Sequence, residues 1–227
     1  MDPVRDAAAL VGERYPEAIA AFLGGSVLSA RRTATSDLDI VVVLTGPPAP
    51  FRESLRWRGW PVELFVHDPA SLEFFFGKDA ARRRPTLARM CVSGVVLAGR
   101  PEDTAKFRER GTAVIAAGPP PLSQPELDRH RYELTDLLDD LAGSTDPAET
   151  AVISWHVWTA TAELALMLAG HWGGSGKWLL RELRDADSGL AQRLVSAIGD
   201  PALLMAAADD VLGRAGGRHW AGYRAGG

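Results

Sequence analysis

A glycine–serine turn and a pair of aspartates are the residues whose types and spacing could do chemistry. Gly24-Gly25-Ser26 follow an apolar segment, and Asp37-Leu38-Asp39 begin eleven residues after the serine. Glycines let a phosphate approach the backbone, and the serine hydroxyl and nearby amides can donate hydrogen bonds to it. Carboxylates at i and i+2 of a strand point to one face and can hold Mg²⁺ against phosphate oxygens. The stretch predicts a triphosphate and metal site.

The segment after the aspartates strengthens this interpretation. Taken alone, a Gly-Gly-Ser is usually a turn and an Asp-x-Asp is often a solvated strand end. Here the aspartates stand directly before Ile40-Val41-Val42-Val43-Leu44, five apolar residues typical of a buried central strand. Carboxylates at the end of such a strand are costly to desolvate unless a cation compensates them.

A third acid, Glu63, lies in the next expected strand, Trp60 to His67. Alternation there places Trp60, Val62, Leu64 and Val66 on one face, with Glu63 and two neighbours on the other. A glutamate on the wet face of an edge strand would explain Glu63 without any chemistry. Together with the upstream motif, Glu63 is predicted to be a metal ligand or the base that takes a proton from an attacking hydroxyl.

Together these motifs resemble the nucleotidyltransferases of the DNA polymerase β superfamily, most closely the small bacterial branch that includes the aminoglycoside nucleotidyltransferases. The resemblance implies that the turn Gly24 to Ser26 holds the nucleoside triphosphate and that Asp37 and Asp39 bind two Mg²⁺ ions. It assigns activation of the acceptor hydroxyl to Glu63. Ser93 to Gly99 resembles the closing core strand of that family. The resemblance covers about the first hundred residues.

The expected function is Mg²⁺-dependent transfer of a nucleoside monophosphate, AMP from ATP in the first instance, to a hydroxyl of a small molecule such as an aminoglycoside-like antibiotic. One alternative acceptor is a protein or tRNA, in a role similar to toxin–antitoxin systems. Another alternative is a protein that binds nucleotide without turnover. The sequence determines neither the acceptor nor the oligomeric state.

The expected fold is α/β: a small mixed-sheet nucleotidyltransferase core over residues 1–100, followed by an all-α helical bundle over residues 101–227 that binds the acceptor. Residues 1–100 contain 13 Lys and Arg against 11 Asp and Glu, a formal charge of +2, while residues 101–227 contain 12 against 18, or −6. An acidic second half suits a cationic acceptor, although acidic helices are equally common as soluble surfaces. With no basic stripe apart from Arg82-Arg83-Arg84, nucleic-acid binding is not expected.

The chain is expected to be cytoplasmic. Its one cysteine, Cys91, excludes an intramolecular disulfide framework and is predicted to be a buried small hydrophobe. The N-terminus lacks the pattern of a signal peptide, and no apolar run is expected to span a membrane.

The expected elements alternate over the first half. A helix begins near Val4, the break at residues 46–50 precedes a short amphipathic helix over residues 51–58, and a further helix begins at Asp68-Pro69. Helices alone follow residue 101, interrupted at residues 118–121, 144–147 and 173–176.

Four residues of the second half are secondary candidates. Lys177, at an expected helix start, could contact the triphosphate, although an exposed lysine is the commoner case. Glu163 could bind an acceptor ammonium or pair with an arginine. Glu133 and Asp136 could belong to an acidic wall for the acceptor, or to the wet face of a leucine-striped helix. Arg214 and His219 match a ribonuclease motif of related helical toxins only in spacing, which we interpret as coincidence.

Overall fold

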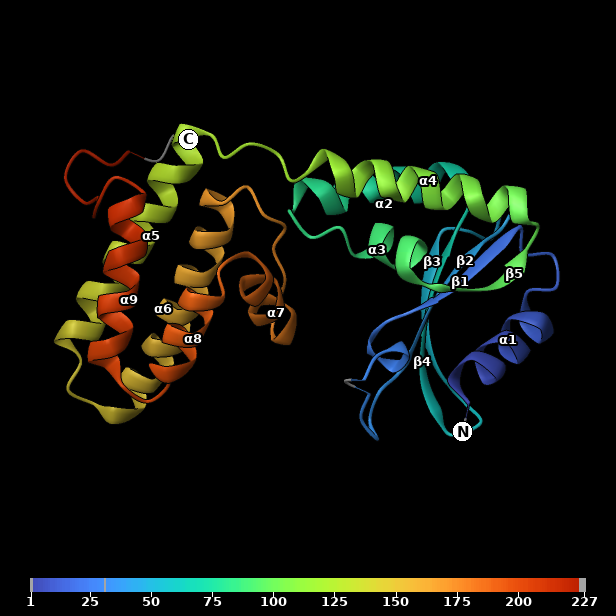
Figure 1. The fold of residues 1–227 in the computed structure, drawn as a ribbon, viewed down its shortest axis with the longest axis horizontal. Helices are drawn as coiled ribbons and strands as arrows, with labels where there is room; N and C mark the ends of the chain where they lie inside the picture. Colours follow the sequence, from blue (N-terminus) through green and yellow to red (C-terminus); the bar gives the residue numbers. More distant parts are fainter. Residues whose placement is uncertain (1, 31, 225–227) are drawn as a thin grey trace. The chain divides into compact units, whose positions relative to one another are not determined.

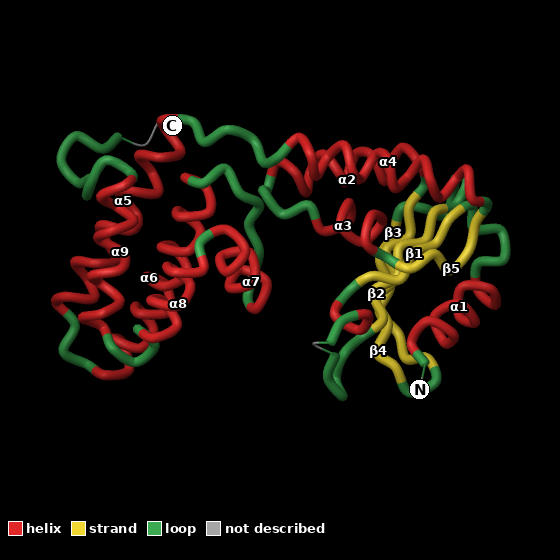
Figure 2. The backbone as a smooth tube through the Cα atoms, in the orientation of Figure 1, coloured by secondary structure: helices red, strands yellow, loops and turns green. Residues whose placement is uncertain are grey.

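A computed structural model describes residues 2–30 and 32–224. These residues form one mixed five-stranded sheet and nine α-helices, an α/β fold followed by a helical region, as the sequence predicts. The chain divides into two compact units, Met1–Gly118 and Pro119–Gly227. We call them the sheet unit and the helical unit, and Figures 1 and 2 show the strands confined to the first.

The sheet has the order β3-β4-β2-β1-β5. Neighbouring strands are antiparallel except for the central pair β2 and β4, which is parallel. The strands are β1 (Ala20–Gly24), β2 (Leu38–Val43), β3 (Phe51–Trp57), β4 (Trp60–His67) and β5 (Val95–Gly99). Strand β2 lies in the centre because its apolar run can be buried on both faces.

Helices cover the two faces of the sheet differently, as Figure 1 shows. Helix α1 (Pro3–Arg14), capped by Asp2, packs its buried side against one face. The opposite face packs against α2 (Pro69–Ala81), α3 (Thr86–Ser93) and α4 (Pro101–Ala117). Asp68 caps α2 in a capping box with Ser71, which confirms the helix start predicted at Asp68-Pro69.

The predicted alternation along β4 is confirmed. Trp60, Val62, Leu64 and Val66 belong to the core on the α1 side, whereas Phe65 packs with the core on the α2–α4 side. Glu63, two residues before Phe65, therefore lies on the α2–α4 side of the sheet.

The helix predicted over residues 51–58 is wrong, because this segment is strand β3. It pairs with β4 through the two-residue turn Arg58-Gly59, in which both residues have positive φ, 47° and 87°. Such a turn matches the twist of two antiparallel strands. Phe51, Leu55 and Trp57 pack toward the α1 side, so the segment follows a strand period of two.

The two compact units divide at Gly118, not between residues 100 and 101 where the sequence predicts the boundary, because α4 belongs to the sheet unit. Arg108 on α4 donates hydrogen bonds to the carbonyl oxygens of Cys91 (3.3 Å) and Gly94 (2.6 Å). Gly111 lies so close to α3 that a Cβ there would be 3.0 Å from Val92 Cγ2. These contacts hold α4 against α3, and the boundary follows at Gly118.

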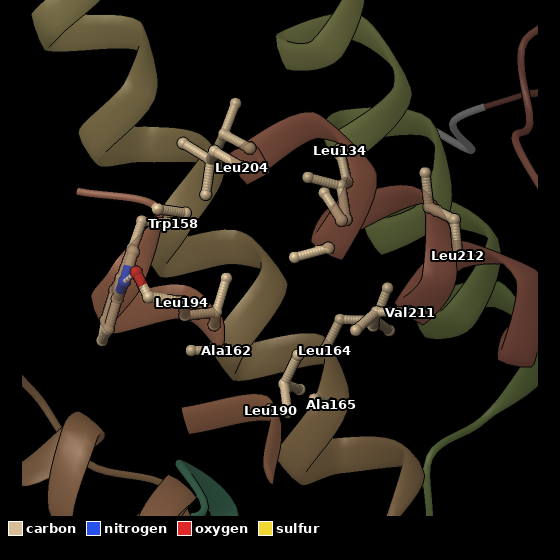
Figure 3. Packing of buried hydrophobic residues seen from close by; sticks show 14 of the residues in the cluster. Leu134, Trp158, Ala162, Leu164, Ala165, Leu190, Leu194, Leu204, Val211 and Leu212 are labelled. Carbon is tan, nitrogen blue, oxygen red and sulfur yellow. Dashed lines mark hydrogen bonds between the residues drawn. The ribbon is translucent and has the colours of Figure 1, made fainter. Parts of the chain in front are cut away.

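The helical unit contains five helices around one apolar core: α5 (Gln124–Gly143), α6 (Pro147–Leu168), α7 (Lys177–Ala186), α8 (Ser188–Ser196) and α9 (Pro201–Arg214). Figure 3 shows side chains of α5, α6, α8 and α9 meeting in this core, with Leu164 of α6 near its centre. Trp158 Nε1 also donates to the Leu194 carbonyl oxygen at 3.0 Å, which joins α6 to α8.

Helix α6 is the one described helix that is long and apolar enough, by length and composition alone, to cross a membrane. The expectation that no segment reaches this length therefore does not hold for α6. Val157, Leu164 and Leu166 on this helix are buried in the core of the helical unit. That packing is typical of the central helix of a bundle.

Candidate metal and nucleotide site

Three carboxylates converge in the sheet unit. Oxygens of Asp37, Asp39 and Glu63 all lie within 4.8 Å of one another, and the three residues are half-buried. Asp37 immediately precedes β2 and Asp39 is its second residue, so both point to one face. Parallel pairing of β2 with β4 sets Asp39 directly opposite Glu63. The structure thus brings together the three acids that the sequence predicts as metal ligands.

The three acids lie at the edge of the area of the sheet that α2, α3 and α4 cover. Val41, two residues beyond Asp39, is buried under the α2–α4 side, and Phe65, two residues beyond Glu63, is partly buried there. The three acids are half-buried. Core residues therefore cover them on one side, and solvent reaches them on the opposite side.

Gly25 makes the turn after β1 possible. Its φ of 81° lies in the left-handed region that glycine adopts without strain. A Cβ at this position would overlap Asp39 Oδ2 and lie 3.1 Å from Asp39 Cγ. The turn therefore passes directly beside a predicted metal ligand, and a larger residue would be strained at this φ and would have to displace the Asp39 side chain.

Ser26 begins the single turn of 3₁₀ helix that follows, Ser26–Leu28, and is buried. Its carbonyl oxygen accepts hydrogen bonds from the Ser29 hydroxyl (2.9 Å) and the Ser29 amide (3.1 Å). Gly24, the other predicted nucleotide ligand, pairs with Asp39 across the strands, and a Cβ there would be 2.9 Å from Met90 Cγ on α3. Gly24 thus allows close packing of α3, whereas Gly25 borders Asp39 and Ser26 is the next residue of the turn.

The loop before Asp37 is fixed by Ser36, which sequence reasoning missed. The buried Ser36 hydroxyl accepts a hydrogen bond from the Thr33 amide at 2.9 Å, and the Ser36 amide donates to the Thr33 carbonyl oxygen at 3.2 Å. This pair closes a turn that leads into Asp37. The sequence signal is a serine beside the aspartate, which is too common to identify a role.

Sequence reasoning also missed Arg52. Its Nη2 donates to Glu63 Oε2 at 2.5 Å, and its guanidinium lies 4.6 Å from the centre of the Phe65 ring. A helix over residues 51–58 gave no reason to expect this contact, because only the hairpin of β3 and β4 brings Arg52 diagonally beside Glu63.

The donor set fits Mg²⁺. This ion binds oxygen ligands and commonly takes one or two protein carboxylates together with phosphate oxygens. Three carboxylates within 4.8 Å repel one another in the absence of cations. The site therefore has the donor atoms and the charge for divalent cations, and the neighbouring turn at Gly25 and Ser26 could hold a phosphate.

The four secondary candidates all lie in the helical unit. Lys177 is the exposed first residue of α7, as predicted. Glu133 on α5 is exposed and ion-paired with Arg129 one turn earlier at 2.9 Å, which favours the wet-face interpretation. Asp136 on α5 and Glu163 on α6 are half-buried. Nucleotide or acceptor roles for these residues stay predictions.

Arg214 and His219 do not share a helix. Helix α9 ends at Arg214, whose guanidinium pairs with Asp187 at 3.4 Å. The amide of His219, beyond the helix, donates to the Thr135 hydroxyl at 3.0 Å. This placement agrees with coincidental spacing.

Two buried titratable groups lie on the α2–α4 side near α2 and α3. His67 ends β4 and meets the Phe75 ring edge-on at 5.3 Å, and burial lowers the pKa of His67 below its ordinary value. Cys91 on α3 is buried, which raises the pKa of its thiol to about 12. Cys91 is therefore an inert core residue, as predicted.

No protein-family model matches this chain, and no curated protein matches it in sequence. Among solved structures it is similar to a nucleotidyltransferase-like protein from Exiguobacterium sibiricum, at 12% identity and a TM-score of 0.47 over 93% of this chain and 75% of that one.

Proposed function

We propose that the chain is a Mg²⁺-dependent nucleotidyltransferase that moves a nucleoside monophosphate from a nucleoside triphosphate, ATP in the first instance, to a hydroxyl of an acceptor. The observation that carries this proposal is the group Asp37, Asp39 and Glu63, drawn from two adjacent parallel strands, with ligand oxygens within 4.8 Å. The Gly25 turn beside Asp39 supplies the expected place for the triphosphate. A cytoplasmic location is part of the proposal.

Each residue then has a distinct task. Asp37 and Asp39 would hold the metal, and Ser26 with the nearby amides would orient the phosphates. Bound Mg²⁺ would stabilise the negative charge that develops on the phosphate oxygens. Glu63 accepts the proton of the acceptor hydroxyl as its oxygen bonds to the α-phosphorus, and pyrophosphate leaves with the electron pair of the broken P–O bond.

Transfer assays test the proposal. Wild-type protein with Mg²⁺, each nucleoside triphosphate and a panel of hydroxylated acceptors should give a product heavier by one nucleoside monophosphate in mass spectrometry. Asp37→Asn and Asp39→Asn should each lower the rate at least 100-fold, because each removes a metal ligand. Glu17→Gln, an exposed acid outside the site, is the matched control and should retain full activity.

Metal binding gives a second readout that does not depend on the acceptor. Titration with Mn²⁺ should show tight sites in wild-type protein and in Glu17→Gln, and weak binding in both aspartate variants. Retained transfer and retained Mn²⁺ binding in the aspartate variants would contradict the assignment. Nucleotide binding without any turnover across small-molecule, protein and tRNA acceptors would favour a non-catalytic nucleotide-binding protein instead.

A further inference from the structure

The outermost strand, β3, presents a basic face beside the acids. Ser54 is the register partner of Glu63, and Arg56 is the partner of Pro61. Because directly opposed residues of antiparallel strands share a face, Arg52, Ser54 and Arg56 lie on the same side of the sheet as the carboxylates. All three are exposed. We call them the β3 basic face.

The opposite side of β3 is packed against the rest of the sheet unit. Phe51, Leu55 and Trp57 pack against the core on the α1 side. Glu53, also on that side, is ion-paired with Arg14 of α1 at 3.1 Å. The strand therefore buries one side and exposes arginines on the side of the site.

Under the proposed function, the strand order places the β3 basic face on the side of the site from which the acceptor approaches. The nucleotide turn follows β1, on one side of β2, whereas Glu63 and β3 lie on the other side. A hydroxyl that gives its proton to Glu63 must approach from the side of β4 and β3. The β3 basic face is then the surface that the rest of the acceptor meets.

The arginines of the β3 basic face can bind an anionic group. Arg56 makes no ion pair with any residue between 2 and 30 or 32 and 224, the parts of the chain that are described. Arg52 is bound to Glu63, and its guanidinium is held over Phe65. A cation held by the neighbouring aspartates would also attract the Glu63 carboxylate, so the charge of Arg52 would then be less fully compensated. A planar guanidinium matches phosphate oxygens in a bidentate arrangement.

We infer that the acceptor carries a phosphate group near its reactive hydroxyl, bound by Arg52 and Arg56 with the Ser54 hydroxyl between them. A phosphorylated sugar, a nucleotide or the 3′ end of an RNA shares this chemistry. A polycationic acceptor of the aminoglycoside type would instead meet two arginines of like charge. The inference rests on the proposed function and replaces the aminoglycoside expected from the sequence.

Matched pairs of probes test the inference by binding. Ribose and ribose 5-phosphate, glycerol and glycerol 3-phosphate, and adenosine and AMP are titrated calorimetrically into protein with Mg²⁺ and a non-hydrolysable triphosphate analogue. An RNA oligomer with a free 3′-hydroxyl and an aminoglycoside complete the panel. At least one phosphorylated probe or the RNA should bind ten times more tightly than the unphosphorylated probes and the aminoglycoside. Arg52→Ala and Arg56→Ala should each weaken that binding at least tenfold.

Arg14→Ala is the matched control, since Arg14 contacts β3 from the opposite side. It should leave probe binding unchanged. Equal binding of phosphorylated and unphosphorylated probes, or tightest binding of the aminoglycoside unaffected by Arg52→Ala and Arg56→Ala, overturns the inference. Preference for RNA over the small phosphates would identify the source of the phosphate.

Transfer assays on the same panel separate the two proposals. Labelling of unphosphorylated or cationic acceptors with kcat/KM unchanged in Arg56→Ala would retain the nucleotidyltransferase and overturn the acceptor inference. Selective phosphate binding that is lost in Arg56→Ala, without transfer to any acceptor, would retain the phosphate site and reject the proposed function.

Discussion

Asp39 on β2 and Glu63 on β4 are register partners in the one parallel strand pair of the described sheet. Their side chains therefore leave the sheet on the same face and at the same level, although 24 positions separate them in the sequence. Asp37, two residues before Asp39, completes the group. The whole candidate metal site thus depends on the register of two strands.

Metal binding should stabilise the sheet unit. Mg²⁺ at about 100 times its Kd would add about 2.7 kcal/mol to the free energy of unfolding, because it binds the folded site alone. We expect Tm in differential scanning calorimetry to rise by roughly 5 to 10 °C in wild-type protein. Asp39→Asn should show little or no rise. An equal rise in both proteins would mean that Mg²⁺ binds elsewhere.

Gly25→Ala should damage both stability and metal binding. Alanine is strained at a φ of 81°, and its Cβ would overlap Asp39 Oδ2. We expect a loss of about 1 to 3 kcal/mol in the free energy of unfolding, measured by urea denaturation, together with weaker Mn²⁺ binding. Gly77→Ala on α2, with nothing within 4 Å of the new Cβ, should stabilise by about 0.5 to 1 kcal/mol. Normal Mn²⁺ binding by Gly25→Ala would contradict the close approach to Asp39.

Cys91 should make the protein less stable at alkaline pH. Its folded pKa of about 12 lies above the ordinary value of 9.0, so the unfolded state loses the thiol proton first and stability falls as pH rises above 9. The expected slope is about 1.4 kcal/mol per pH unit between pH 9 and 12. Cys91→Ala should lack this component in urea denaturation across that range. Identical slopes for the two proteins would mean that the folded thiol titrates normally.

Trp158→Phe should destabilise the helical unit by about 1 to 3 kcal/mol. The change leaves the Leu194 carbonyl oxygen without its indole donor and opens space in the core that Figure 3 shows. Thermal unfolding followed by circular dichroism measures the loss. Trp178→Phe, at an exposed position on α7, should change stability by about 0.5 kcal/mol or less. Similar effects of the two substitutions would show that burial of Trp158 contributes little.

The sequence by itself identified the central strand, the alternation of β4 and the three acids, because these signals are local. Hydrophobic period and turn residues act over a few positions, so they can be interpreted without knowing what packs against them. The segment at residues 51–58 shows the limit of this reasoning. Its apolar residues fit a short amphipathic helix or a strand, and pairing with β4 decided for the strand.

Tertiary structure alone decided which residues surround the acids. Ser36 carries only a local signal too common to identify a role, and Arg52 reaches Glu63 only because the β3–β4 hairpin aligns the two strands. The boundary at Gly118 likewise depends on packing, since α4 is held to α3 by Arg108 and a close approach at Gly111. Sequence patterns determine which face of an element is buried, whereas the partner of that face depends on strand register and helix packing between residues far apart in the chain.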